Sequence, residues 1–212
     1  LATVMQEMWN ASNMSFGLCP ILSQGAVEAI SIHGTDAQKK LYLPKLVSGE
    51  WTGTMNLTEP QAGSDLNALK AKGARNDAKC TGIEHKIGIH ASPTCVMSYG
   101  DEGGAIGTLI GEENRGLACM FTMMNNARLL VGTQGVAIAD RAYQHALAFA
   151  QERKQGRPAG TTLPAGEMAP IIAHPDIRRI LMTMKAMTSA ARAICYSNAV
   201  AIDTAHHGAD DA

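Results

Sequence analysis

The feature that most constrains the fold is the spacing of apolar residues after Pro175. They recur every three or four positions and trace one face, formed by Ile177, Ile180, Leu181, Met184, Met187, Ala191, Ile194, Ala201 and Ile202. This spacing is typical of an amphipathic α-helix. Proline suits the first helical position, because its missing N–H would have no intrahelical acceptor there. The sequence therefore predicts a long helix that begins at Pro175 and buries this face.

A second long helix is predicted from Leu117 to Gln155. It contains Gly132 and Gly135, and each glycine inside a helix costs about 1 kcal/mol relative to alanine. We therefore expect another backbone to approach closely at these two positions. The Pro- and Gly-rich segment 157–166 predicts a loop between the two helices.

The first 50 residues are also predicted to be helical. Apolar residues with helical spacing indicate a buried face in the first helix: Leu1, Val4, Met5 and Met8. Ser23 is a candidate cap of a second helix that runs towards His33. Thr35 and Gln38 fit a capping box, in which each side chain binds a backbone N–H of the helix start.

The middle region, residues 51–116, has frequent glycines and short mixed segments. Segment 51–57 predicts a strand, and segment 103–111 predicts a turn followed by a short strand. The predicted fold class is therefore mainly α with a small β domain (α+β). We expect an N-terminal helical portion at 1–50, a partial β domain at 51–116 and the start of a C-terminal helical bundle at 117–212.

Charge and cysteine content limit the classes of function. There are 18 basic and 19 acidic residues, so no basic excess favours a nucleic-acid or membrane-surface partner. We find no apolar run long enough to span a bilayer and expect no stable membrane insertion. The five dispersed cysteines indicate reduced thiols and a cytoplasmic location. The first residue is not Met, so we expect the sequence to begin inside a larger protein.

The segment Thr58-Glu-Pro-Gln-Ala-Gly-Ser-Asp65 carries the candidate site. Pro60 fixes its own backbone, Gly63 allows close approach of another group, and Thr58 and Ser64 supply hydroxyls. Such a loop binds a phosphate oxygen or the polar edge of a ring. An ordinary capped turn explains the same residues and is the more frequent case. The histidine pairs 85/90 and 206/207 have no third ligand in register, so no metal site is predicted.

Four ordered segments give a more specific indication. Met55-Asn-Leu-Thr-Glu-Pro-Gln-Ala-Gly-Ser-Asp65 is similar to the flavin-binding signature of acyl-CoA dehydrogenases. Segments 84–97, 111–120 and 132–156 resemble, in order, a later β-domain stretch, the entry to the C-terminal domain and its first long helix in that family. The sequence most resembles a large bacterial branch that includes fatty acyl-CoA and 3-methylmercaptopropionyl-CoA enzymes.

The resemblance implies a role for FAD and for particular residues. FAD would be bound by residues of two segments: Met55, Leu57, Thr58, Gly63, Ser64, Arg153 and Gln155. The acyl-CoA substrate would be bound by Ser64, Asn125 and Arg128, although many relatives carry an acidic residue where Asn125 stands. Arg153 and Gln155 would reach the FAD of a neighbouring subunit, which implies a homo-oligomer (dimer or tetramer).

Two parts of the family pattern are absent. The family's catalytic base, usually a Glu of the last helices, is expected beyond Ala212, so no catalytic residue is nominated. Lys72 runs directly into Gly73 where further strands are expected, and a β-sandwich needs about 100 residues. The sequence therefore lacks a β segment near this junction. Either the protein contains residues that are absent from this sequence, or the protein itself is truncated.

The predicted function is FAD-dependent α,β-dehydrogenation of an acyl-CoA to the 2-enoyl-CoA, in fatty-acid or related acyl-CoA oxidation. The electrons would pass to an acceptor of the electron-transfer flavoprotein type. The alternative is a truncated or degenerate family member without catalytic activity that serves as a helical association protein. The small residues of segment 117–155 would suit that role.

Overall fold

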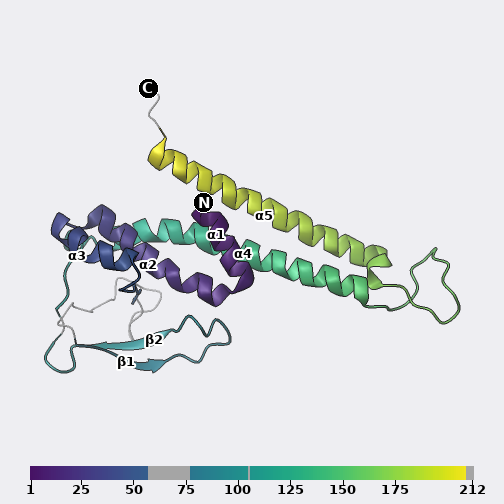
Figure 1. Ribbon diagram of the computed structural model, residues 1–212, viewed down its shortest axis with the longest axis horizontal. Helices are drawn as coiled ribbons and strands as arrows, with labels where there is room; N and C mark the ends of the chain where they lie inside the picture. Colours follow the sequence, from purple (N-terminus) through teal and green to yellow (C-terminus); the bar gives the residue numbers. More distant parts are fainter. Residues whose placement is uncertain (57–76, 105, 209–212) are drawn as a thin grey trace. The chain divides into compact units, whose positions relative to one another are not determined.

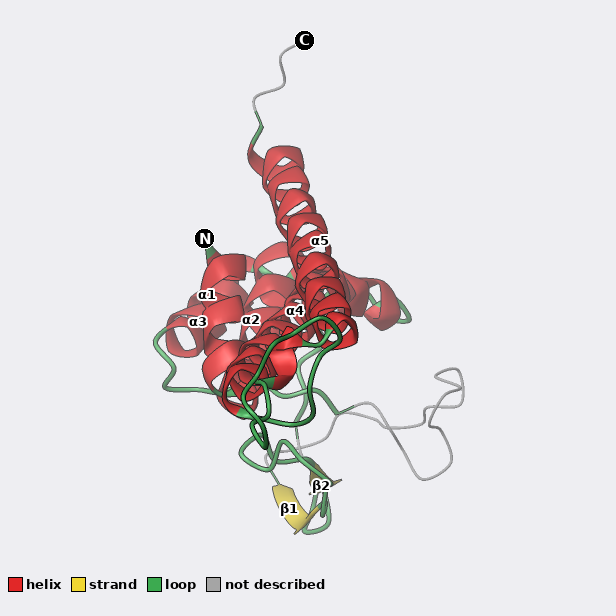
Figure 2. Ribbon diagram, turned by 90° about the vertical axis from the view of Figure 1, so that its right-hand side faces the viewer, coloured by secondary structure: helices red, strands yellow, loops and turns green. Residues whose placement is uncertain are grey.

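Helices dominate the computed structural model, which describes residues 1–56, 77–104 and 106–208 (Figures 1 and 2). In chain order the elements are α1 (Ala2–Ser12), α2 (Met14–His33), α3 (Asp36–Val47), β1 (Ala78–Ile83), β2 (Cys95–Tyr99), α4 (Gly116–Glu152), the 3-10 turn η2 (Ile171–Ala173) and α5 (Pro175–His207). The mainly helical fold with a small two-stranded sheet confirms the predicted fold class.

The chain divides into two compact units. One contains Leu1–Met14 and Arg128–Ala212, and the other contains Ser15–Ala127. We call them unit 1 and unit 2 and describe each by itself. The domain boundaries expected from the sequence, at residues 50/51 and 116/117, stay predictions.

Unit 1 contains α1, α5 and most of α4. Its apolar core consists of Leu129, Leu130, Val136, Ala137, Ala150, Ala169 and Leu181, each buried. The predicted helix from Leu117 is confirmed as α4, and Pro175 stands in the first turn of α5 as predicted. The connecting loop lies between them, at residues 153–170.

The predicted buried face of α5 is wrong in most of its length. Leu181 is buried, but Ile180, Met187 and Ile194 are 41%, 69% and 71% exposed. The expected backbone contact at Gly135 is also wrong, because a Cβ placed there would meet nothing within 4 Å. At Gly132 the nearest neighbour is a side chain, the Cys195 Sγ, at 3.5 Å.

Helix α1 buries a polar face and not the apolar face that the sequence predicted. Val4, Met5 and Met8 are exposed, whereas Thr3, Gln6 and Asn10 are buried. Together with Glu7 these polar residues form an i, i+3, i+4, i+7 stripe, the spacing of one helix face. Glu7 is bound by two side chains of α5, so the orientation of α1 follows its polar contacts rather than its apolar residues.

Unit 2 begins with α2 and α3. The capping box at Thr35 is confirmed: the Thr35 N–H donates to Gln38 Oε1 at 2.8 Å, and the Gln38 N–H donates to Thr35 Oγ1 at 3.3 Å. The prediction that Ser23 caps a helix is wrong, since Ser23 lies inside α2. Its hydroxyl instead accepts a hydrogen bond from the Gly53 N–H at 3.0 Å.

The two strands form one antiparallel pair, in which Ala78 pairs with Tyr99 and Ile83 pairs with Cys95. A β-bulge interrupts the pairing between Cys80 and Gly82. The sequence did not predict strands at these positions.

The two strands that it did predict are wrong where the structure describes them, since residues 51–56 and 106–111 have no strand pairing. Both segments instead bind α3. Trp51 donates its N–H to the Lys45 carbonyl at 3.0 Å and its ring lies under the Lys45 ammonium, 4.6 Å from the ring centre. Gln38 Nε2 donates to the Leu109 carbonyl at 2.8 Å. Contacts with a helix have replaced contacts with a neighbouring strand.

Helix α2 bears on the membrane prediction. It has 20 residues and is long and apolar enough to cross a bilayer by length and composition, so the expectation that no segment reaches that length is wrong. The core helices of soluble proteins meet the same criterion, so this property alone does not assign α2 to a membrane.

Candidate cofactor- and substrate-binding residues

The predicted flavin loop lies largely outside the described residues. Leu57, Thr58, Gly63 and Ser64 all fall in the range 57–76 that the structure leaves undescribed. Met55 is described, and its side chain is 45% exposed. The Met55 side chain is therefore accessible to a ligand, and the other four predictions stay as the sequence made them.

The second predicted cofactor segment follows the end of α4 and has a well-fixed backbone. Lys154 forms an antiparallel bridge with Pro170. Around it, the Gln155 N–H donates to the Ala169 carbonyl at 3.0 Å, and the Ile171 N–H donates to the Arg153 carbonyl at 2.8 Å. These bonds join the two ends of the loop between α4 and η2, so the backbone that carries Arg153 and Gln155 is held in place.

The side chains of Arg153 and Gln155 point outward from this backbone as a polar pair. Arg153 Nη2 donates to Gln155 Oε1 across a long 3.4 Å, and both residues are exposed. A guanidinium presents a planar fork of donors that matches phosphate oxygens. An exposed Arg with one long hydrogen bond among the described residues keeps donors available for phosphate oxygens.

Gly156 and His174 complete this segment. Gly156 has a φ of +68°, a left-handed conformation that glycine adopts without strain. His174 contacts the Gln155 carbonyl through Nε2 at 2.8 Å, and a carbonyl only accepts, so Nε2 carries the proton. The histidine thereby links the Gln155 backbone to the start of α5.

The predicted substrate residues Asn125 and Arg128 lie three positions apart on α4, which places them on one side of that helix. Both residues are exposed. Arg128 and Glu152, the last residue of α4, are separated by about 36 Å along the axis at 1.5 Å per residue. Arg128 and Arg153 are therefore too far apart to bind the same small group.

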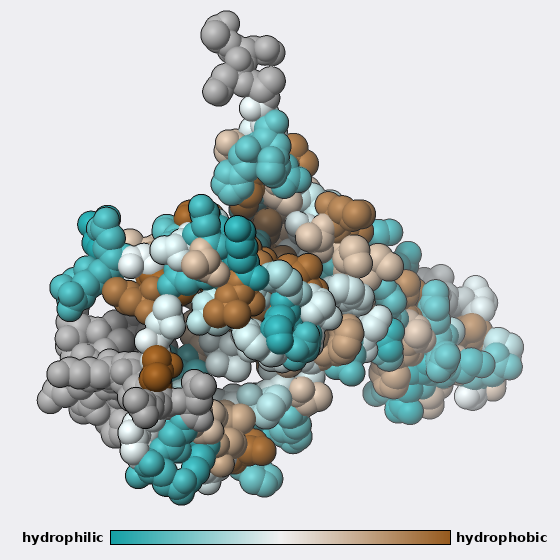
Figure 3. Space-filling view, turned by 60° about the vertical axis from the view of Figure 1, so that its left-hand side comes forward, coloured by the Kyte–Doolittle hydropathy of each residue, from teal (hydrophilic) through white to brown (hydrophobic). Residues whose placement is uncertain are grey.

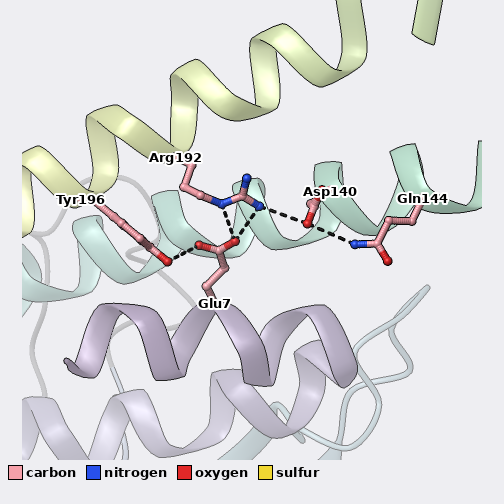
Figure 4. A network of polar contacts seen from close by, with 5 residues as sticks. All are labelled: Glu7, Asp140, Gln144, Arg192 and Tyr196. Atoms are coloured by element: carbon pink, nitrogen blue, oxygen red, sulfur yellow. Dashed lines mark hydrogen bonds and ion pairs between the residues drawn. The ribbon is translucent and has the colours of Figure 1, made fainter. Parts of the chain in front are cut away.

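A polar network in unit 1 was missed by the sequence analysis (Figure 4). Glu7 of α1 accepts hydrogen bonds from Arg192 Nε at 2.8 Å and from the Tyr196 hydroxyl at 2.7 Å, both on α5. Arg192 also contacts Asp140 of α4 at 3.1 Å, and Asp140 accepts from Gln144. The network joins all three helices of unit 1.

The network determines the charge state of its members. Burial raises the pKa of Glu7, but hydrogen bonds from Arg192 and Tyr196 and the charge of Arg192 outweigh it, so the pKa lies below the ordinary value. The hydrogen bond with Glu7 raises the pKa of Arg192. Burial, followed by the same carboxylate, raises the pKa of Tyr196. An ionised Glu7 is thus favoured, as its ion pair with Arg192 requires. A neutral Tyr196 is also favoured, which keeps the hydroxyl proton that it donates to Glu7.

Unit 2 contains a groove of about 600 Å³ that the sequence analysis did not anticipate. It is lined by α2, the end of α3, the segment 49–52 and Asn126. Asn126 Nδ2 donates to Glu28 Oε2 at 3.3 Å, so a carboxylate on the groove wall already has a partner. Among the residues that the structure describes, none that lines this groove is one predicted for cofactor or substrate.

Comparison with known proteins assigns the family. A model described as "Acyl-CoA dehydrogenase, N-terminal domain" matches residues 1–50, and "Acyl-CoA dehydrogenase, C-terminal domain" matches residues 114–212. The chain belongs to the acyl-CoA dehydrogenase family. The family resemblance read from the sequence is thereby confirmed.

Curated relatives agree with this assignment. The chain is 40% identical to a 3-methylmercaptopropionyl-CoA dehydrogenase of Ruegeria pomeroyi, over 97% of this chain and 45% of the relative. It is 31% identical to a butyryl-CoA dehydrogenase of Syntrophomonas wolfei, with the same coverage. The chain therefore spans less than half the length of these relatives.

The first of these alignments has 269 positions, whereas the chain has 212 residues, so the relative contains residues without a counterpart here. An internal gap produces such an excess. The predicted position of the gap, between Lys72 and Gly73, lies outside the described residues and stays a prediction.

Solved structures show the same fold. Butyryl-CoA dehydrogenase from Megasphaera elsdenii matches 92% of this chain and 61% of its own, with a TM-score of 0.78 and 20% identity. An acyl-CoA dehydrogenase complexed with FAD from Bacillus anthracis matches 92% of this chain and 39% of its own, with a TM-score of 0.75 and 23% identity.

Proposed function

We propose that this chain forms part of a FAD-dependent acyl-CoA dehydrogenase, which converts an acyl-CoA thioester to the 2-enoyl-CoA in fatty-acid or related acyl-CoA oxidation. The observation that carries the proposal is the 40% identity, over 97% of the chain, to a 3-methylmercaptopropionyl-CoA dehydrogenase. Membership of the family supports the class of reaction.

The residues at the end of α4 support FAD as the cofactor. Arg153 would bind the diphosphate through its exposed guanidinium, and Gln155 would orient that guanidinium. The predicted flavin loop, Met55 to Ser64, would contact the flavin. When bound, FAD supplies the acceptor for the hydride that leaves the β-carbon.

The substrate would be held by the CoA-side residues Asn125 and Arg128, with Ser64 where substrate and flavin meet. An arginine at this position binds an anionic or polar part of CoA through charge-assisted hydrogen bonds. No residue of this chain is assigned as the base that removes the α-proton.

The proposed partners follow from the same arrangement. Arg128 lies about 36 Å along α4 from Glu152, the residue before Arg153, and Arg153 would serve the cofactor of a neighbouring subunit in a homo-oligomer. Electrons would leave to an electron-transfer flavoprotein. Five free thiols support a reducing, cytoplasmic location.

A second candidate function is association without catalysis, and one observation favours it. Large apolar side chains are exposed along α5, among them Met182, Met187 and Ile194 at 71%, 69% and 71%. Figure 3 shows hydrophobic side chains, drawn in brown, at the surface between polar ones on the face it draws. A helix with this exposure associates readily with another apolar surface.

A visible spectrum separates the two functions. The protein is purified, reconstituted with FAD, and mixed with a saturated acyl-CoA without oxygen. A yellow protein that bleaches supports the dehydrogenase. A protein that stays colourless after reconstitution contradicts the flavoenzyme and supports association alone.

A further inference from the structure

Two cysteines lie on the same face of the β1–β2 pair. Cys95 is paired with Ile83, and Cys80 is paired with Met97 two residues further along β2. Alternate residues of a strand share a face, and so do residues paired directly across an antiparallel ladder. The side chains of Cys80 and Cys95 are therefore diagonal neighbours on one face.

The β-bulge produces this arrangement. Thr81 is the extra residue between the pairs Cys80–Met97 and Gly82–Val96. In a regular ladder Thr81 would pair with Met97 and Cys80 with Ser98, so Cys80 would lie on the opposite face from Cys95.

The two cysteines are neighbours across the strand pair. The pairing register places the Cys80 and Cys95 side chains next to each other, and Cys80 Sγ donates to the Gly82 carbonyl at 3.3 Å. Both cysteines are exposed, so a small reagent reaches them from solvent. The contact with Cys80 raises the pKa of the Cys95 thiol, while the nearby Lys86 acts in the opposite direction.

The other three cysteines provide an internal comparison. Cys119 lies near Gly111 in unit 2, and Cys195 lies near Gly132 in unit 1. Cys19 is exposed on the wall of the groove in unit 2. All three are free thiols, and none has a hydrogen bond with another cysteine among those that the structure gives.

We propose that Cys80 and Cys95 form a thiol–disulfide exchange site for low-molecular-weight disulfides such as oxidised glutathione. One cysteine thiolate attacks the glutathione disulfide, forms a mixed disulfide and releases one glutathione thiolate. The second cysteine thiolate attacks the protein sulfur of that mixed disulfide and releases the second glutathione thiolate. The protons of the two cysteines pass to the released thiolates, so glutathione is reduced and the cysteine pair is oxidised.

Closure of the bond links β1 directly to β2. A disulfide restricts the unfolded chain between its two cysteines and so stabilises the hairpin that it closes. The two-stranded sheet is exposed on both strands, and the strands of such a ribbon twist readily. The ribbon can therefore twist to bring the two sulfurs to bonding distance.

The test uses the purified full chain after removal of reductant. It is incubated with excess oxidised glutathione, remaining thiols are blocked, and the digested protein is analysed by mass. We expect a cross-link between the peptides of Cys80 and Cys95, with loss of two hydrogens and no retained glutathione. The Cys80→Ser variant should retain one glutathione on Cys95, and the Cys19→Ser variant should form the same cross-link as the unmodified protein.

The same reaction in denaturant shows whether the folded contact matters. The cross-link should form faster in the folded chain, because the hairpin holds the sulfurs together. Equal rates in both conditions overturn the proposal. A stable glutathione adduct on Cys80 or Cys95 of the unmodified chain, a cross-link to Cys19 instead, or no reaction at the pair also overturns it.

Discussion

At the scale of single residues, Glu7 joins the first helix to the last. Its side chain is 12% exposed, and it receives hydrogen bonds from Arg192 and Tyr196 of α5. A carboxylate in such surroundings is stable only with its partners, because burial of an unpaired charge is costly. This one acidic side chain therefore determines how α1 packs against α5 in unit 1.

Replacement of this carboxylate should weaken unit 1. The Glu7→Gln variant loses the ion pair with Arg192 while the size of the side chain is kept. We expect a loss of about 1.5–3 kcal/mol in the free energy of unfolding, the range for hydrogen bonds to charged groups. Urea denaturation followed by circular dichroism measures it.

The matched control is Glu50→Gln. The Glu50–Lys45 ion pair is 2.9 Å long, close to the 2.8 Å of the Glu7–Arg192 pair, but the Glu50 side chain is 60% exposed. An exposed pair contributes about 0–1 kcal/mol. Equal losses in the two variants would contradict the importance assigned to the Glu7 network.

The stability that Glu7 provides should depend on pH. Its pKa in the folded chain lies below the ordinary 4.5. A lowered carboxyl pKa contributes stability that is complete above the unfolded pKa and is lost as the pH falls through the folded pKa. The difference in unfolding free energy between the unmodified protein and Glu7→Gln should therefore be constant near neutral pH and shrink below about 4.5.

Thermal unfolding of both proteins between neutral and acidic pH measures this difference. A gap that widens as the pH falls would show that Glu7 is not held as a carboxylate. Buffers of constant ionic strength are needed, since salt screens the exposed ion pairs of the chain.

At the scale of elements, two glycines have unequal roles. Gly135 lies in the interior of α4 with nothing within 4 Å of a Cβ, although the sequence suggested a close contact there. Gly53, which follows α3, is the reverse case, because a Cβ would lie 2.8 Å from the Leu22 carbonyl oxygen and 2.9 Å from the Ser23 Cα. Backbone atoms at such distances have little freedom to move away.

Alanine should therefore have opposite effects at these two positions. Gly135→Ala should stabilise the protein by about 0.5–1 kcal/mol, because alanine restricts the unfolded chain and favours the helix. Gly53→Ala should destabilise it through the clash with α2. Midpoints of urea unfolding measure both, and a destabilising Gly135→Ala would indicate a contact that the structure lacks.

At the scale of the whole molecule, the proposed cofactor role of Arg153 is the claim with the widest consequence. Arg153→Ala should weaken FAD binding about 10- to 100-fold, since a charge-assisted hydrogen bond is worth about 1.5–3 kcal/mol. Titration of the apoprotein with FAD, followed by flavin fluorescence, measures the affinity.

Arg179→Ala serves as its control. Arg179 is an exposed arginine of the same unit, already paired with Asp176 at 2.8 Å. We expect its FAD affinity to match that of the unmodified protein. Equal affinity in Arg153→Ala would show that the family role does not transfer to this residue.

Local rules in the sequence determined the two long helices, the starts of α3 and α5, and the family. The capping box at Thr35 and the proline that begins α5 depend on neighbours within one turn, so the sequence alone predicts them. The tertiary structure decided which faces are buried and which segments pair. Val4 and Met5 are exposed because Glu7 directs the polar side of α1 towards α5. Trp51 binds α3 instead of a strand, and the shared face of Cys80 and Cys95 depends on a bulge in the pairing register. These outcomes depend on contacts between residues that are distant in the sequence, and a local sequence pattern does not predict such contacts.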